Sequence, residues 1–381
     1  MKVDWKKVKL QDICESISDG DHLPPPKAEK GIPFVTISNI KNNQFDFTNT
    51  MFVPELYYEK LDNKRKAKIG DILYSVVGSF GIPVLIKNNE KIVFQRHIAI
   101  LRPEKIDSHF LFYTMLSKAF YAKANAVAIG AAQRTVSLTA LRNIEISLPP
   151  LEIQQKIASI LSAYDDLIEN NRKQIKLLEE AAQRLYKEWF VDLRFPGYEN
   201  VAIVDGVPEG WRIGTLGEIG EFKRGKTITK AQAGNGKVPV VAGGIEPAYY
   251  TDKSNTSAPV ITISASGNAG FVKIYFSKIW ASDCSFLDME TNENLYYIYS
   301  FLKANQTYIY SLQKGACQQH VYAKDINAME LTIPKINIIS DYVCFVTPYF
   351  EKMKPLQKQI QLLQQARDKL LPRLMSGEME V

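Results

Sequence analysis

A chain of 381 residues is long enough for two or three domains. Its residues are 46% apolar and 23% charged, which is typical of a globular protein rather than a fibrous or disordered one. Without a run of about 18 apolar residues or an apolar segment of signal-peptide type in the start MKVDWKKVKLQDI, we expect neither a membrane span nor a secretory signal. The net charge is +6. Residues 1–150 hold 21 Lys and Arg against 15 Asp and Glu, residues 211–335 hold 13 against 10, and residues 336–381 hold 6 against 5, whereas residues 151–210 are acidic with 7 against 11. Two positive blocks around an acidic one suit two contacts with a polyanion or ordinary scatter of surface charge.

The metal-binding and redox residues form no pattern. The four cysteines, Cys14, Cys284, Cys317 and Cys344, have no C-x-x-C spacing, and the four histidines show no ligand spacing. We therefore predict no metal site and no disulfide framework, and the cysteine usage suits a reducing cytoplasm.

Residues 1–150 are predicted to form a small α+β domain. Segments 32–40, 70–78 and 91–103 are rich in Val, Ile and Phe and predict strands, and 108–124 predicts one amphipathic helix. The candidate nucleic-acid contacts in this block are polar or basic: Lys64, Arg65, Lys66, Lys68, Arg96, Gln133 and Arg134. A solvated face or a structural turn is the alternative for each of them.

Residues 151–193 predict a long helix, because 151–190 contain neither Gly nor Pro and apolar residues recur at steps of four and three. The predicted pairing positions are Ile157, Leu161, Tyr164, Ile168, Ile175, Leu178, Ala182, Leu185 and Trp189, with one polar break at Asn171. Residues 194–210 are predicted to be a linker.

Residues 211–335 predict a second α+β domain, with strands at 237–244, 258–267 and 270–280 and a helix at 293–312. Its candidate nucleic-acid contacts are Lys223, Arg224, Lys226, Lys230, Lys237, Lys253 and Gln318. GEFKRGKT (220–227) fits the phosphate-binding pattern G-x-x-x-x-G-K-[ST]. That loop needs a buried strand before it and a long helix after it, and Gly234 and Gly236 interrupt the segment that follows, so we favour a basic turn.

Residues 336–381 predict a second long helix. Its pairing positions are Tyr342, Val346, Tyr349, Met353, Leu356, Ile360, Leu363, Leu370 and Leu374, with one charged break at Arg367. Pro348 and Pro355 are expected to begin this helix or to kink it.

The chain is an internal repeat. WKKVKLQDI (5–13) matches WRIGTLGEI (211–219), GAAQRTV (130–136) matches GACQQHV (315–321), and QIKLLEEAAQRL (174–185) matches QIQLLQQARDKL (359–370). The offset is 206 for the first match and 185 for the other two, so the middles differ in length. We predict two α+β domains joined by two long helices in an antiparallel coiled coil, with pseudo-two-fold symmetry; helices packed separately on their own domains are the alternative.

Residue groups that could perform catalysis are not apparent. A DNA adenine methyltransferase would need a glycine-rich cofactor loop and an N/D-P-P-Y/F motif, but LPPL (148–151) offers no amide or carboxylate. Asp71 and Asp283 are isolated acids rather than a cluster that could hold a metal for a nuclease. We predict a chain that is not an enzyme and binds no cofactor.

LPPLEIQQKIASIL (148–161), NNRKQIKLLEEAAQRLYKEWFVDLRFPGYEN (170–200), VPEGW (207–211) and LLPRLMSGEMEV (370–381) resemble the specificity subunit of type I restriction–modification systems. The resemblance implies two target-recognition domains that read the halves of a split, asymmetric site in double-stranded DNA, and helices that act as a ruler. It also implies two bound methyltransferase subunits, further restriction subunits, and partners that bind the methyl donor and ATP. The segment IPKINIISDY (333–342) does not repeat the sequence PLEIQQKI (150–157) of the first copy.

Three other classes of protein stay open: a coiled-coil adaptor that binds no DNA, a P-loop ATPase, and the DNA-recognition part of another restriction–methylation enzyme. For a single-chain enzyme of that kind, Met1–Trp5 would leave no room for upstream catalytic motifs. The bases recognised do not follow from the sequence.

Overall fold

The computed structural model describes residues 5–381 except 42, 48–49, 132, 235 and 317. The chain divides into two units: unit 1 comprises Met1–Ile168 with Gln361–Val381, and unit 2 comprises Glu169–Ile360. Each unit therefore contains one globular part and a section of each long helix.

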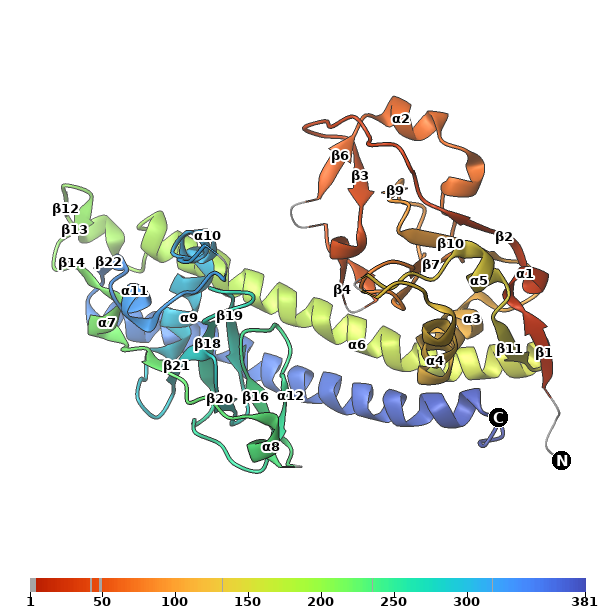
Figure 1. Ribbon diagram of the computed structural model, residues 1–381. Helices are drawn as coiled ribbons and strands as arrows, with labels where there is room; N and C mark the ends of the chain where they lie inside the picture. The colour runs from red at the N-terminus through yellow and green to blue at the C-terminus, as the bar shows by residue number, and fades with distance from the viewer. Residues whose placement is uncertain (1–4, 42, 48–49, 132, 235, 317) are drawn as a thin grey trace. The chain divides into compact units, whose positions relative to one another are not determined.

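The globular part of unit 1 is a mixed α+β structure (Figure 1). Its strands are β1 (Lys6–Lys9), β2 (Cys14–Asp19), β3 (Ile32–Val35), β4 (Ile40–Lys41), β5 (Gln44–Phe45), β6 (Met51–Val53), β7 (Ile72–Ser75), β8 (Pro83–Leu85), β9 (Val93–Phe94), β10 (Ile98–Pro103) and β11 (Glu145–Leu148). Its helices are α1 (Leu10–Ile13), η1 (Ile37–Asn39), α2 (Glu55–Lys60), η2 (Asn63–Arg65), α3 (Ser108–Leu116), α4 (Lys118–Val127) and α5 (Leu138–Arg142).

The strands of unit 1 form two sheets and two short strand pairs. The order of the larger sheet is β2-β10-β7-β8, that of the smaller is β6-β3-β9, and β1-β11 and β4-β5 are pairs. Because successive side chains of a strand point to opposite faces, the central strand β7 contributes to two cores. Ile72 and Tyr74 pack in the core that contains α3, whereas Leu73 packs with Val35 and Phe94 of the smaller sheet.

Unit 2 contains the same kinds of element. Its strands are β12 (Ile203–Val204), β13 (Val207–Pro208), β14 (Arg212–Thr215), β15 (Lys223–Arg224), β16 (Val238–Val241), β17 (Tyr249–Thr251), β18 (Val260–Ser264), β19 (Val272–Tyr275), β20 (Trp280–Ala281), β21 (Cys284–Asp288) and β22 (Glu330–Ile333). Its shorter helices are η3 (Lys187–Val191), η4 (Tyr198–Asn200), α7 (Leu216–Ile219), α8 (Lys230–Ala233), α9 (Leu295–Ala304), α10 (Gln306–Ser311) and α11 (Ala323–Asn327).

The sheets of unit 2 match those of unit 1 strand by strand. The order β15-β21-β18-β19 corresponds to β2-β10-β7-β8, β17-β16-β20 corresponds to β6-β3-β9, and β14-β22 corresponds to β1-β11. The parallel pairing of β3 with β9 recurs between β16 and β20. The repeat in the sequence is thus a repeat of topology, despite middles of different length.

Each of the two predicted globular helices is divided in two, so a single helix was the wrong prediction in both cases. Between α3 and α4, the Ser117 hydroxyl donates to the Thr114 carbonyl and accepts from the Phe120 backbone N–H, so it ends one helix and caps the next. Between α9 and α10, the Asn305 side chain donates to the Phe301 carbonyl. Such polar side chains hydrogen-bond to the backbone and end a helix. The apolar periodicity on either side of them predicted one continuous helix, so these ends were missed in the sequence.

The long helices are α6 (Leu151–Tyr186), which continues into the π-helical turn η3, and α12 (Ile336–Met375). Pro348 and Pro355 do not begin α12, because both lie within its 40 residues. Both prolines are exposed, so the carbonyl groups that lose a hydrogen-bond partner lie on a side of the helix that water reaches.

The two long helices pair antiparallel within each unit. In unit 1, Ile157 and Leu161 share a core with Leu371 and Leu374. In unit 2, Ala182 shares a core with Val346, and Asn171 donates to Gln359 at 3.2 Å. All positions of both predicted heptad patterns, from Ile157 to Trp189 and from Tyr342 to Leu374, are buried or half-buried. Both predicted breaks are polar contacts across the helix pair: Asn171 with Gln359, and Arg367 with Asp165.

Among the residues that the structure describes, no helix is both long enough and apolar enough to cross a membrane.

Candidate nucleic-acid interface

Each unit presents an exposed loop with a glutamine at the same place. In unit 1, Ile129 and Thr135 exchange backbone hydrogen bonds of 2.9 and 2.8 Å, and the loop between them exposes Gln133 and Arg134. Gly130 has a φ of 94°, and a Cβ there would lie 2.5 Å from the Gln133 carbonyl oxygen. Only glycine fits this tight closure, which accounts for the spacing from Gly130 to Gln133.

Unit 2 builds the same loop. Lys314 and His320 exchange backbone hydrogen bonds of 2.9 and 2.8 Å, and Gly315, with a φ of 117°, would place a Cβ 2.3 Å from the Gln318 carbonyl oxygen. This loop exposes Gln318 and Gln319. The matched spacing is therefore that of a structural turn, and each turn exposes its glutamine side chain.

A second glycine loop lies against the first, and our sequence reasoning missed it. In unit 1 the β7–β8 loop binds the Gln133 loop, because Gly78 N–H donates to the Arg134 carbonyl and Val136 N–H to the Val76 carbonyl, both at 2.9 Å. In unit 2, Val321 N–H donates to the Ala265 carbonyl at 3.0 Å. The signal was present: residues 75–81 and 264–270 both fit S-x-x-G-x-x-G. We call the two loops of each unit its paired loops: 76–81 with the described residues of 129–135 in unit 1, and 265–270 with those of 314–320 in unit 2.

The predicted basic residues of unit 1 differ in whether their side chains are exposed or are bound to other groups of the same unit. Lys64 and Lys68 are exposed, whereas Arg65 binds the buried Asp21 carboxylate at 3.1 Å. The Lys66 ammonium donates to the Glu59 carbonyl at 2.8 Å and lies 5.4 Å from the centre of the Tyr58 ring. These last two side chains thus serve internal contacts.

Arg96 and Arg134 are the other two predicted basic residues of unit 1. Arg96 is exposed beside His97, with 3.4 Å between their side-chain nitrogens. Burial, and then the charge of Arg96, lowers the pKa of His97. Arg134 donates to the carbonyls of Asn125 and Ala128 at the C-terminal end of α4, where a positive charge is favourable. The Arg134 side chain therefore also makes hydrogen bonds within its own unit.

A groove of about 460 Å³ runs along β2 in unit 1. Its lining includes Lys64, Arg65 and Arg142, a basic residue that the sequence analysis did not single out. The Arg142 guanidinium donates to the Ile17 carbonyl at 2.5 Å. Glu15, Asp19 and Asp62 also line the groove, so its charge is mixed rather than uniformly positive.

The predicted basic residues of unit 2 lie around both of its sheets. Lys223 and Arg224 form β15, the edge strand of the larger sheet, which pairs with β21. Lys230 begins α8, and Lys237 and Lys253 flank the paired ends of β16 and β17, where Val238 pairs with Thr251. The six basic candidates are all exposed, namely Lys223, Arg224, Lys226, Lys230, Lys237 and Lys253. Gln318 belongs to the paired loops instead.

The segment 220–227 is built as a sheet edge and not as a phosphate-binding loop. Gly225 N–H donates to the Cys284 carbonyl at 2.8 Å and Lys226 N–H to the Ala281 carbonyl at 2.9 Å, so neither is free for a phosphate. A Cβ on Gly225 would lie 2.4 Å from the Ser282 carbonyl oxygen. Gly20 makes the same close approach in unit 1, where a Cβ would lie 2.2 Å from the Phe94 carbonyl oxygen. Close backbone packing in both units explains the glycine.

Among the described residues, no group of three or more His, Cys, Asp and Glu side chains is placed to hold a metal ion. Cys14 and Cys284 are buried free thiols, and burial is the main cause that raises the pKa of each to about 12. Cys344 is exposed, and Cys317 lies outside the described residues.

These observations define a class of protein: two repeated α+β units, each with an exposed pair of loops and a section of one antiparallel helix pair. A family model, "Type I restriction modification DNA specificity domain", matches residues 2–180 and 208–370. The chain belongs to this family, and the resemblance found in the sequence and the predicted fold class are confirmed.

Relatives and a solved structure agree over nearly the whole chain. The MjaIX specificity subunit of Methanocaldococcus jannaschii is 27% identical over 99% of this chain and 94% of its own length. The HindI specificity subunit of Haemophilus influenzae is 22% identical over 98% of this chain and 99% of its own length. The crystal structure of an S subunit from M. genitalium is 19% identical, covers 98% of this chain and 96% of that chain, and superposes with a TM-score of 0.57, which shows a common fold.

Proposed function

We propose that this chain is the DNA-recognition subunit of a type I restriction–modification complex and reads one half of a bipartite, asymmetric site with each unit. The observation behind the proposal is the repeated pair of loops on a shared backbone, with an exposed Ser79 in unit 1 where unit 2 has an exposed Asn268. A common framework with different exposed side chains suits two half-sites of different sequence. In this proposal residues 1–150 and 211–335 are the recognition domains, 151–193 and 336–381 the constant helices, and 194–210 the linker.

The chain recognises DNA but does not catalyse in this proposal, and its partners bind the methyl donor and ATP. A coiled-coil adaptor that binds no DNA is the second candidate. The observation that favours it is the mixed charge of the groove along β2, because a DNA-binding surface is expected to be mainly positive. We further propose a cytoplasmic location, which suits the free thiols Cys14, Cys284 and Cys344.

The proposal is tested by mapping methylated adenines across the genome of a host that expresses this chain with its methyltransferase partner. We expect one split motif with two different halves. A gel shift with random and motif-bearing DNA, with and without the methyltransferase subunit, separates this result from that of an adaptor. An adaptor would leave the methylated motif unchanged when this chain is omitted.

We propose that the long helices also bind two methyltransferase subunits, because exposed apolar side chains on them recur at the offset of 185. Unit 1 exposes Leu151, Ile160 and Leu362, and unit 2 exposes Ile336, Phe345 and Leu177 at the equivalent positions. Exposed apolar side chains that both copies keep at equivalent positions suit a repeated protein interface. Two equivalent sets suit two copies of one partner, one for each unit.

Replacing Leu177 and Leu362 with Asp should remove this binding, because each carboxylate would be buried unpaired at an interface. We expect each single variant to keep one methyltransferase subunit and lose affinity for the other by about tenfold or more. The double variant should keep neither, as measured by native mass spectrometry. Leu167→Asp is the matched control, since Leu167 is equally exposed but its equivalent is Lys352. Equal losses in the control would contradict the repeated surface.

Phosphate contacts and base contacts should respond differently to substitution. Lys64 is exposed, and we expect Lys64→Ala to weaken binding to all DNA sequences alike and to lower the salt slope by about one. Gln133→Ala should cost roughly 1–3 kcal/mol against the cognate site alone. Fluorescence anisotropy over a salt series measures both, with Lys105→Ala as an exposed control. A loss confined to the cognate site in Lys64→Ala would reverse the assignment.

Lys226→Ala should leave ATP-dependent activity of the assembled complex unchanged, apart from a modest loss of DNA affinity. The reason is that the backbone N–H groups of Gly225 and Lys226 are already bonded within the sheet. ATP hydrolysis by the complex and ATP binding by the isolated chain are measured beside Lys278→Ala, an exposed lysine of the same unit. Tight ATP binding by the isolated chain that is lost in Lys226→Ala would overturn this expectation.

A further inference from the structure

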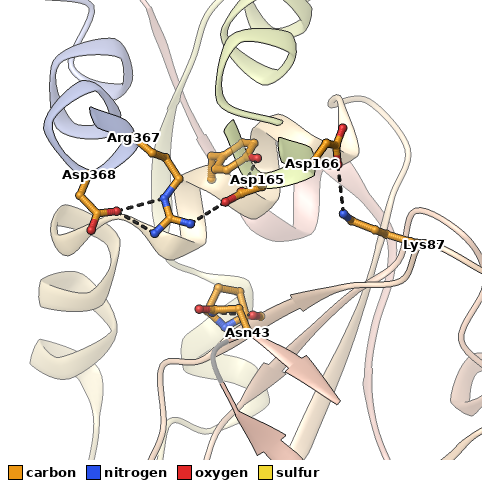
Figure 2. A network of polar contacts seen from close by, with 8 residues as sticks. Asn43, Lys87, Asp165, Asp166, Arg367 and Asp368 are labelled. Atoms are coloured by element: carbon orange, nitrogen blue, oxygen red, sulfur yellow. Dashed lines mark hydrogen bonds and ion pairs between the residues drawn. The ribbon is translucent and has the colours of Figure 1, made fainter. Parts of the chain in front are cut away.

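A polar network in unit 1 joins the two long helices to the globular part (Figure 2). The Arg367 guanidinium on α12 binds the Asp165 carboxylate on α6 at 2.5 Å, and the Tyr113 hydroxyl on α3 donates to the other oxygen of Asp165 at 2.7 Å. The side chains of Arg367 and Asp165 are only 20% and 23% exposed. Burial, and then the Asp165 charge, raises the pKa of Tyr113, so this tyrosine stays a neutral donor.

The second copy of the repeat has different chemistry at the equivalent positions. The offset of 185 relates Asp165 to Phe350 and Arg367 to Ala182. Both equivalents are buried in the core of unit 2, where the ring of Phe350 stacks on Tyr296 with 4.2 Å between centroids. The ion pair of unit 1 is thus replaced by an apolar and aromatic contact in unit 2.

We propose that the Asp165–Arg367 pair makes α6 select α12 as its partner and reject a second copy of itself. Because the helices are repeats, α6 could pair with another α6 in the same antiparallel register. Asp165 would then face Ala182 and lose its cation. In a pair of α12 helices Arg367 would face Phe350 and keep only Asp368 of its own helix, an exposed carboxylate that it binds at 2.8 Å. Removing one partner of a sheltered ion pair is strongly unfavourable, and only the pairing of unlike helices gives the Asp165 carboxylate a cation.

The experiment cuts the folded full-length chain between its halves. Asp205 and Gly206 lie in the exposed turn between β12 and β13, and a protease recognition sequence is inserted between them. After cleavage the halves are separated in urea and reassociated by dilution. Native mass spectrometry then counts pairs of unlike halves and pairs of like halves, which differ in mass.

With Asp165 and Arg367 in place, unlike pairs should exceed like pairs by roughly tenfold or more. The D165F/R367A double variant gives both copies the chemistry of unit 2, and its products should approach the statistical mixture. The D165R/R367D double variant reverses the charges and should restore the excess, which keeps the test valid if the D165F substitution impairs refolding. The proposal fails if D165F/R367A keeps the original ratio, or if D165R/R367D refolds without an excess of unlike pairs.

Discussion

Inserting one heptad after Ile168 and another after Ile360 is expected to widen the spacer of the recognised DNA site by about 3 base pairs. Seven helical residues add about 10 Å, and base pairs are about 3.4 Å apart. The half-site sequences should stay the same, because the globular parts are untouched. Mapping methylated adenines in a host that expresses the variant measures both.

The choice of insertion points follows from the helix pairing. Asn171 faces Gln359, so Ile168 and Ile360 lie nearly opposite one another and coincide with the boundaries of the two units. Both polar contacts, Asn171–Gln359 and Asp165–Arg367, then remain within their own unit. Insertion after Ile168 alone is the control: the pairing in the two units can no longer be kept together, and specific methylation should be lost. An unchanged spacer in the double insertion would show that the helices do not set this distance.

Replacing residues 14–129 with the equivalent segment of another member of the family is expected to change one half of the methylated motif and leave the other intact. The replaced segment begins with β2 and ends at Ile129, whose closure with Thr135 is made by backbone groups and so does not depend on the new side chains. Each unit has its own core and its own paired loops, so a change in unit 1 should not reach the contacts of unit 2.

The matched control replaces residues 220–314, which are the equivalents of 14–129 under the two offsets of the repeat. This exchange should change the other half of the motif. If either replacement altered both halves, the assignment of one half-site to each unit would be wrong. A stability measurement on each hybrid distinguishes a changed half-site from a damaged unit.

The repeat and the long helices could be predicted from the sequence, because heptad spacing is dictated by helix geometry and does not depend on the rest of the fold. The breaks at Ser117 and Asn305 could not, since each depends on a side chain that competes with the backbone at a single residue. The course of α12 past Pro348 was also unpredictable, because it depends on which side of the helix faces water.

The candidate site was predictable as a list of residues but not as an arrangement. Basic residues are visible in a sequence, but their partners are not. Arg65 binds Asp21, which lies 44 residues away in the chain, and Arg134 binds the carbonyl of Asn125 at the end of α4, nine residues away. The Gln133 and Gln318 loops were found because the repeat compares the chain with itself, and the same comparison would have found Gly78 and Gly267.

The closure of the Gln133 and Gln318 loops also bears on how such a protein can acquire new specificity. The closure of each loop is made by one glycine and by hydrogen bonds between main-chain atoms, so it does not depend on the side chains of Gln133, Gln318 and Gln319. Mutations at Gln133 or Gln319 can therefore be accepted without refolding the domain, whereas mutations at Gly130 or Gly315 cannot. A fixed scaffold of this kind lets the exposed residues change while the fold stays constant, as the two halves of this chain illustrate with one topology and different sequences.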